Sequence, residues 1–282
     1  MKISLCTISF RHHLVSLAEL AIWAQTNQFQ GIELWAAHGR NLASQQHLNG
    51  NWLAAFGLEV PMVSDYLPTS GSVKQMEDKT QALCQLAHRW HARKLRTFAG
   101  SAGSAETHPD EREKVVGMLR RQCEIAADNG LELLVETHPG TLADCGSSTV
   151  KLLAEIDHPA FKINFDTLHV WEGGDDPQTL LEQIRPYVAH YHFKNVSQRH
   201  LLPVFTPSNV YAAAGSREGM VPLFDGLVDY KAFFDSLADD DNVEGSLEWF
   251  GNDVFSTLQN DRRKLSYLLL GRHKSPDMLR AV

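Results

Sequence analysis

The segment from Leu131 to His169, LELLVETHPGTLADCGSSTVKLLAEIDHPAFKINFDTLH, decides the fold that this sequence predicts. It begins with a short apolar run, LELLVETH, that is typical of a buried strand, and it ends with a similar run, FKINFDTLH. Between them SSTVKLLAEID favours a helix, with Ser147 or Ser148 as its N-cap. Two strands joined by a helix run parallel in one sheet, so this segment predicts a strand–helix–strand unit.

The same alternation extends over the whole chain. Eight strand-like runs are separated by helical segments, one of them around residues 41–56 and another beginning near Pro109. We therefore predict one α/β domain over residues 1–282, a (β/α)8 TIM barrel. An open doubly wound sheet is the alternative, but GSAGSAE at 100–106 lacks the GxGxxG spacing of a dinucleotide-binding loop. The strand-like runs are KISLCTI, GIELW, LEVPMVSDY, KLRTFAG, LELLVETH, FKINFDTLH, VAHYHFKN and EGSLEWF.

The composition and the cysteines favour a cytoplasmic protein and leave a small anionic substrate possible. Hydrophobic residues make up 43% of the 282 residues, and the formal net charge of −8 disfavours binding to nucleic acid or an anionic membrane. We expect no spanning helix, because no run of about 18 apolar residues occurs, and MKISLCTISF reads as a strand rather than a signal peptide. Reduced, mostly buried thiols are expected for the scattered cysteines, which are Cys6, Cys84, Cys123 and Cys145.

Four consecutive strand-like runs end in a residue that can bind a metal ion. These residues are Glu136, Asp166, His192 and Glu248, and each interrupts an apolar or aromatic run. Neighbouring barrel strands place their C-terminal ends around one pocket. Three carboxylates and an imidazole gathered there repel one another and lose hydration unless a cation neutralises them. Mostly oxygen ligands with one nitrogen suit a divalent Mn²⁺, Mg²⁺, Co²⁺ or Zn²⁺ ion.

Two further histidines accompany the predicted ligands, and each has a plain structural alternative. His138 lies two residues beyond Glu136, so it is either a general base beside the metal ion or a loop histidine. His169 lies three residues beyond Asp166, on the turn after the strand. It is either an acid–base group or a partner that hydrogen-bonds a ligand, or else a structural histidine of the turn.

Two cations and two aromatic residues lie near other strand ends. Lys194 either binds an anionic group beside the ion or is a solvated charge. Arg96 interrupts KLRTFAG and pairs with either a substrate anion or a structural carboxylate. Tyr66 is a candidate donor to a substrate oxygen, whereas Trp35 is expected to pack in the wall.

The run HYHFKN, residues 190–195, is predicted to be the seventh strand arriving at the pocket. Alternation turns its even-numbered residues inward and turns Tyr191 and Phe193 outward against the helices. His190 lies one step deeper than the ligand, and we expect it to hydrogen-bond within the core. The oversized connection that follows, residues 196–224, is expected to be an ordered functional loop on the active-site face.

Several contiguous motifs resemble those of one enzyme family, the 3-dehydroshikimate dehydratases of the petrobactin-biosynthesis type, within the xylose-isomerase-like TIM-barrel superfamily. The motifs are SLCTISFRH, GIELW, SDYL, RTFAG, ETHP, HYHFKN, NVYAAAG, GMVPLF and SLEWF. The resemblance spans nearly the whole chain and is weakest over residues 37–57 and 101–110 and in the C-terminal tail. Those parts fall outside the predicted metal pocket.

The resemblance implies conversion of 3-dehydroshikimate to protocatechuate and water with one divalent ion, most often manganese. It implies loss of the C4 proton to a base, a metal-stabilised enediolate, and departure of the C5 hydroxyl as water. A homodimer is possible, and the product can feed siderophore biosynthesis or belong to aromatic catabolism such as quinate use. The implied metal ligands are Glu136, Asp166, His192 and Glu248, and the implied base is His138. The implied substrate-binding residues are Arg96, Lys194, Tyr211 and Tyr66. We add His169 and Lys194 as catalytic candidates and, more weakly, Arg217 as a substrate-binding candidate, since related epimerases have an arginine in a comparable loop.

Two other activities fit the same barrel. A sugar isomerase or epimerase uses the same kind of metal site but needs no cations for a carboxylate, so Arg96 and Lys194 favour an anionic substrate. A DNA-repair nuclease with three metal ions needs further ligands on the early strands and a basic groove, and the acidic net charge disfavours it.

Overall fold

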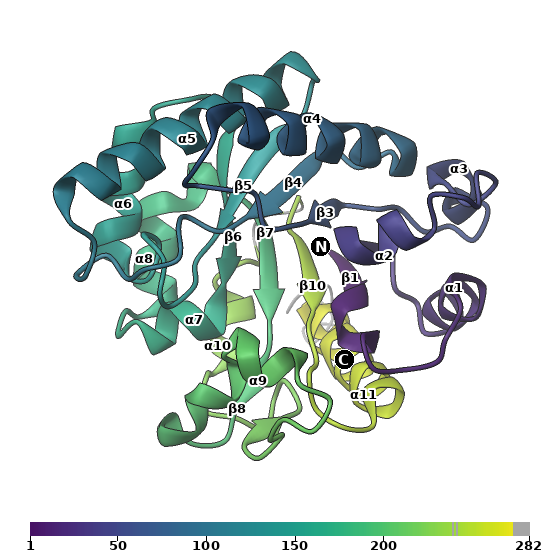
Figure 1. The fold of residues 1–282 in the computed structure, drawn as a ribbon. Helices are drawn as coiled ribbons and strands as arrows, with labels where there is room; N and C mark the ends of the chain where they lie inside the picture. Colours follow the sequence, from purple (N-terminus) through teal and green to yellow (C-terminus); the bar gives the residue numbers. More distant parts are fainter. Residues whose placement is uncertain (239, 241, 273–282) are drawn as a thin grey trace, which may run out of the picture.

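The computed structural model describes residues 1–238, 240 and 242–272, and in this part of the chain eight parallel strands close into a barrel (Figure 1). Their order round the barrel is β1-β10-β7-β6-β5-β4-β3-β2, so strands that follow one another in the chain lie side by side. This arrangement confirms the predicted (β/α)8 barrel. The barrel strands are β1 (Lys2–Cys6), β2 (Gly31–Trp35), β3 (Met62–Ser64), β4 (Lys94–Thr97), β5 (Glu132–Glu136), β6 (Phe161–Asp166), β7 (Val188–Phe193) and β10 (Glu244–Leu247).

Helices surround the barrel and cover the outer faces of its strands (Figure 1). The predicted start of a long helix at Pro109 is confirmed, with His108 as its N-cap. The helices are η1 (Thr7–Phe10), α1 (Leu17–Thr26), α2 (Ala36–Asn41), α3 (Gly50–Ala54), α4 (Val73–Trp90), α5 (Pro109–Asp128), α6 (Gly146–Ile156), α7 (Thr167–Glu172), α8 (Pro177–Ile184), η2 (Arg185–Tyr187), η3 (Arg199–Phe205), α9 (Pro207–Tyr211), α10 (Tyr230–Asp235) and α11 (Val254–Arg272).

Two local predictions were wrong. The helical segment expected around residues 41–56 is instead α2, a turn and α3. The carbonyl oxygens of the turn accept hydrogen bonds from a side chain rather than from helical backbone N–H groups, since Arg89 donates to Leu42, Gln45 and Leu48. Helix α6 begins at Gly146 with Cys145 as its N-cap, two or three residues before the serines predicted as the N-cap. The side chain of Asp175 accepts from Gly146 N at 2.7 Å, which satisfies a backbone donor of the first turn.

The strand register aligns the candidate site. Asp166 lies directly opposite His192 in the β6–β7 pair, after a register shift between Ile163 and Asn164. Glu136 lies opposite Asn164 in the β5–β6 pair. The predicted outward packing of β7 is also confirmed, since the ring of Phe193 lies 4.9 Å from that of Phe234, beside α10.

The connection after β7 is ordered and lies beyond the C-terminal ends of the strands (Figure 1). It contains a two-stranded antiparallel ribbon, β8 (Asn195–Val196) with β9 (Met220–Val221), as well as η3 and α9. Arg11, which follows η1, donates from Nε to the carbonyl of Val210 at 2.7 Å. The loop is thereby attached to the first strand–helix connection across the barrel mouth.

Within the described residues, all four cysteines are free, and only Cys145 is not fully buried. A search of the same residues finds no helix with the length and apolar character needed to cross a membrane.

Replacing Gly245 with alanine should destabilise the barrel. A Cβ atom there would overlap the ring of Phe193 and lie 3.2 Å from Cβ of Tyr191, and both neighbours are buried on β7. We expect the free energy of unfolding to fall by about 1–3 kcal/mol, as for other overpacked cores. The matched control is Gly117→Ala in α5, where the new Cβ meets no described atom within 4 Å. Urea unfolding of both variants checks this, and equal destabilisation of both would contradict the packing argument.

Candidate metal and substrate site

The four predicted metal ligands come together at the C-terminal ends of the strands. Glu136, Asp166 and His192 end or nearly end β5, β6 and β7, Glu248 directly follows β10, and none is more than 5% exposed. Nδ1 of His192 lies 3.6 Å from Glu136 Oε1 and 3.8 Å from Glu248 Oε1. Donor atoms of Asp166, His192 and Glu248 all lie within 4.8 Å of one another. Ligands bind such ions at about 2.0–2.2 Å, so one ion between them is sterically feasible.

The charges at this site fit a divalent cation. Burial disfavours a charged imidazole, but the nearby carboxylates hold the pKa of His192 well above its usual range. Nδ1 of His192 is buried and has no hydrogen-bond partner among the described residues. The buried carboxylates at the site are Glu33, Glu136, Asp166 and Glu248, and the permanent cations among them are Arg96 and Lys194. With His192 neutral, the negative charge of these groups therefore exceeds their positive charge by two.

Arg96, on β4, has both a carboxylate partner and a free nitrogen. Its Nε lies 3.0 Å from Glu136 Oε2, and its guanidinium lies over the rings of Tyr66 and Phe98. Its Nη1 is buried, and no described residue accepts a hydrogen bond from it. A buried guanidinium nitrogen without a partner is costly, so Arg96 is suited to receive an anionic oxygen.

Lys194 contacts two of the predicted ligands. Its ammonium group donates to Asp166 and lies 2.6 Å from Glu248 Oε2. Burial favours the neutral amine, but these two carboxylates raise the pKa of Lys194, and the side chain stays charged. The sequence did not predict this contact, since Lys194 was expected to face a substrate anion or solvent.

His138 and His169 lie side by side, with ring centroids 4.5 Å apart. Nδ1 of His138 lies 2.7 Å from the carbonyl oxygen of Pro139, so Nδ1 carries the hydrogen and Nε2 keeps its lone pair. Burial, with a smaller contribution from His169, lowers the pKa of His138 to about 3, so the ring is neutral. Nδ1 of His169 lies 2.7 Å from Glu172 Oε2. The structure therefore presents His138 as a neutral imidazole whose Nε2 is a hydrogen-bond acceptor.

Tyr66 and Tyr211 meet across the mouth of the site, where their hydroxyl groups hydrogen-bond to one another. Burial raises the pKa of both side chains, so both hydroxyls are protonated donors. Trp35 stacks on Tyr211 with centroids 5.9 Å apart, in line with its expected place in the wall. Arg217 instead donates to the carbonyl oxygens of Asn209, Ser216 and Ala212 within the loop.

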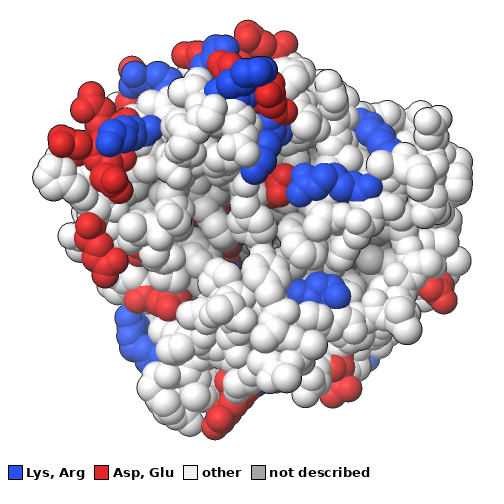
Figure 2. All heavy atoms as spheres, in the orientation of Figure 1, with Lys and Arg blue, Asp and Glu red and all other residues white. Residues whose placement is uncertain are grey.

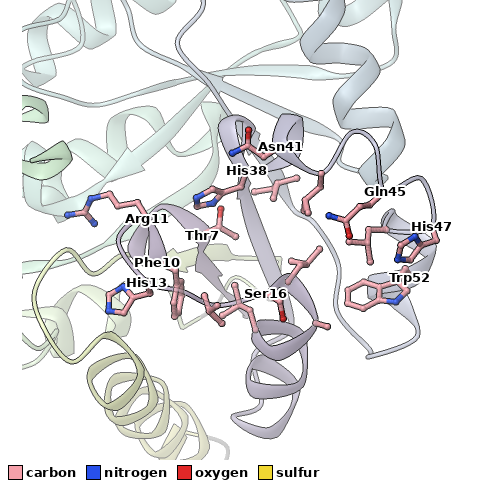
Figure 3. A pocket seen from close by; sticks show the side chains of 17 residues that line it. Thr7, Phe10, Arg11, His13, Ser16, His38, Asn41, Gln45, His47 and Trp52 are labelled. Atoms are coloured by element: carbon pink, nitrogen blue, oxygen red, sulfur yellow. The ribbon is translucent and has the colours of Figure 1, made fainter. Parts of the chain in front are cut away.

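The residues around these groups enclose a small cavity. Its volume of about 40 Å³ holds a few water molecules, and its lining includes Tyr66, Arg96, His138, His169, Lys194 and Glu248 but not Arg217. Figure 2 shows a hollow near the middle of this face, with basic and acidic side chains scattered around it rather than in a basic stripe. A roomier cavity of about 580 Å³ lies between the η1–α1 and α2–α3 segments. Figure 3 shows Arg11 pointing away from that second cavity.

Glu33, in the middle of β2, was not among the site residues predicted from the sequence. Glu33 is fully buried, and its carboxylate accepts from Ser64 and lies 2.8 Å from His192 Nε2. The signal was the single charge in GIELW, a run that is otherwise apolar. His190 forms the expected core contact, with Nε2 2.9 Å from Ser246 Oγ.

A parallel eight-stranded barrel with carboxylates and an imidazole at its strand ends is typical of one protein family. A family profile described as Xylose isomerase-like TIM barrel matches residues 22–268, and the chain belongs to this family. Within it, the chain groups with the 3-dehydroshikimate dehydratases. It is 46% identical over 272 residues to the 3-dehydroshikimate dehydratase of Bacillus anthracis, and the match covers 94% of this chain and 97% of that protein.

Two solved structures are similar to this chain over nearly its whole length. The crystal structure of the probable 3-dehydroshikimate dehydratase AsbF, involved in petrobactin synthesis in Bacillus anthracis, superposes with a TM-score of 0.90 at 45% identity. That match covers 94% of this chain and 99% of AsbF. The IOLI protein, solved with a zinc atom, has a TM-score of 0.74 at 13% identity over 96% of this chain and 98% of its own. At that identity the likeness shows the fold alone.

Proposed function

We propose that this chain dehydrates 3-dehydroshikimate to protocatechuate, with one divalent ion held by Glu136, Asp166, His192 and Glu248. One observation carries the proposal. A buried three-carboxylate, one-imidazole cluster lies beside an arginine with an unpartnered nitrogen, in a chain 46% identical to a 3-dehydroshikimate dehydratase.

The metal site supplies Lewis-acid chemistry. A divalent ion bound there would withdraw electron density from the C3 ketone and C4 hydroxyl oxygens of the substrate, which makes the C4 proton more acidic. Three of the four ligands are carboxylates, which favours Mn²⁺ or Mg²⁺ over a softer ion, and we propose Mn²⁺. Zn²⁺ remains a weaker choice, with the zinc of the IOLI structure in its favour.

His138 is the proposed base for the C4 proton. Its Nδ1 hydrogen is held by the Pro139 carbonyl, and its neutral Nε2 is free to accept a proton inside the cavity. The C5 hydroxyl, which is β to the ketone, then leaves as water with a proton from Lys194, the charged donor in the cavity lining. His169, beside His138, assists proton transfer. Loss of a C6 proton and protonation of the C3 oxygen complete the aromatic ring.

The substrate carboxylate is proposed to bind Arg96 through its unpartnered Nη1. Tyr66 and Tyr211 would donate to substrate oxygens once their mutual hydrogen bond opens. This opening is required, because a cavity of about 40 Å³ has room for a few waters and not for a six-membered ring with four polar substituents.

A comparison of substrates tests the proposed function. We expect 3-dehydroshikimate to be converted, and its methyl ester to have a kcat/KM lower by about 10–100-fold, the range for losing a hydrogen bond to a charged group. The ester has the same reacting carbons and serves as the matched control. Neutral ketoses should not be epimerised. Epimerisation of a ketose, without conversion of 3-dehydroshikimate, would favour a sugar epimerase instead.

A further inference from the structure

We infer that Glu33 is a positioning residue that fixes the orientation and tautomer of the His192 imidazole, so that Nδ1 presents its lone pair to the metal site. The inference rests on the proposed metal-dependent function and deepens its description of the site. It concerns a residue that touches neither the cavity nor the other three ligands.

Both oxygens of the Glu33 carboxylate act as hydrogen-bond acceptors. Oε1 accepts from the hydroxyl of Ser64, and Oε2 lies 2.8 Å from Nε2 of His192 and 3.5 Å from Nε2 of His190. A carboxylate accepts and cannot donate, so Nε2 of His192 must carry the hydrogen. A metal ion binds the neutral imidazole, which has one donor and one acceptor nitrogen, so in the metal-bound form Nδ1 is the acceptor.

The acceptor nitrogen faces the predicted ligands. Nδ1 of His192 lies 3.6 Å from Glu136 and 3.8 Å from Glu248, and it has no hydrogen-bond partner in the described part of the chain. Ligand histidines commonly donate their second nitrogen to a carboxylate, which holds the ring and raises its basicity. Glu33 supplies that carboxylate from β2, across the barrel from β7.

A second metal ion at Glu33, His190 and His192 is the competing interpretation, because their donor atoms also lie within 4.8 Å of one another. The hydrogen bonds argue against it. Both oxygens of Glu33 already accept, and His190 Nε2 lies 2.9 Å from Ser246 Oγ. All three side chains are fully buried, and none lines the cavity.

The wild-type protein gives the first test. In the zinc-loaded form, ¹H–¹⁵N NMR should show the His192 hydrogen on Nε2 with a strongly deshielded proton, and zinc on Nδ1. Zinc on Nε2 would overturn the inference without affecting the proposed reaction. This measurement needs no variant and is unaffected by folding of a mutant.

The second test is metal affinity. Glu33→Gln keeps the shape and should weaken Mn²⁺ binding by about 10–100-fold, the usual effect of losing such a partner. It should also move the Nε2 proton of His192 upfield, which a merely structural role would not do. The control Ser246→Ala removes the hydroxyl that lies 2.9 Å from His190 Nε2 and should leave Mn²⁺ affinity near the wild-type value.

Wild-type affinity in Glu33→Gln would overturn the inference alone. Two ions per wild-type chain, with one lost in the variant, would make Glu33 a ligand and overturn it as well. Absence of any bound ion in the wild type would instead overturn the proposed metal site, and the inference with it. Wild-type protocatechuate formation, assayed separately, distinguishes failure of the inference from failure of the proposed reaction.

Discussion

Replacing Glu248 with glutamine should remove most bound metal and lower kcat/KM by about 10²–10⁴-fold. The expected size follows from Lewis-acid stabilisation of several kcal/mol, at 1.36 kcal/mol for each tenfold change in rate. The amide is a weaker ligand and cannot balance the charge of a cation. In the wild type, Oε1 of Glu248 lies 3.8 Å from Nδ1 of His192, so the substitution acts directly on the predicted ligand set.

Glu244→Gln is the matched control for this variant. Glu244 begins β10, the strand that Glu248 follows, but it pairs with Lys94 at 2.6 Å near the opposite end of the barrel. Metal content by mass spectrometry and kcat/KM should stay near wild type in this control. An unchanged metal content in Glu248→Gln would contradict the four-ligand assignment.

Replacing His138 with alanine should leave metal content unchanged and lower kcat by about 10²–10⁴-fold, the usual value of a positioned general base. Nδ1 of His138 is held by the carbonyl oxygen of Pro139, which leaves Nε2 with a lone pair in the cavity. Loss of this ring therefore removes the proposed proton acceptor. Steady-state kinetics with 3-dehydroshikimate, and metal analysis of the same preparation, measure both parts.

His88→Ala, on the exposed face of α4, is the control for loss of a histidine. It should have wild-type kcat. If His138→Ala turned over at the wild-type rate, another group must take the C4 proton, and His169 would be the next candidate because its ring lies 4.5 Å away.

The barrel could be predicted because its evidence is local. Each strand-like run ends near a helical pattern, and the polar residues that interrupt those runs at their C-terminal ends are the ones the structure gathers. Asp166 and His192 face each other because parallel strands align their ends, which follows from the fold class alone.

Contacts across the barrel could not be predicted, because they depend on register between distant strands. Glu33 and His192 are 159 residues apart in sequence, and no pattern around either residue specifies the other. The same holds for Lys194, whose ion pair with Glu248 depends on where two separate strands end. Distant contacts also limit the prediction of helices. Arg89 donates to carbonyl oxygens of a turn that the sequence pattern assigned to a helix.

The most direct test of the account is metal removal and return with the wild-type protein. The chain is stripped with a chelator, Mn²⁺, Mg²⁺, Co²⁺ or Zn²⁺ is added back, and protocatechuate formation from 3-dehydroshikimate is followed by absorbance. We expect no product from the stripped protein and recovery with Mn²⁺ at one ion per chain. Full activity of the stripped protein, or no product with any of the four ions, would contradict a metal-dependent dehydration of 3-dehydroshikimate.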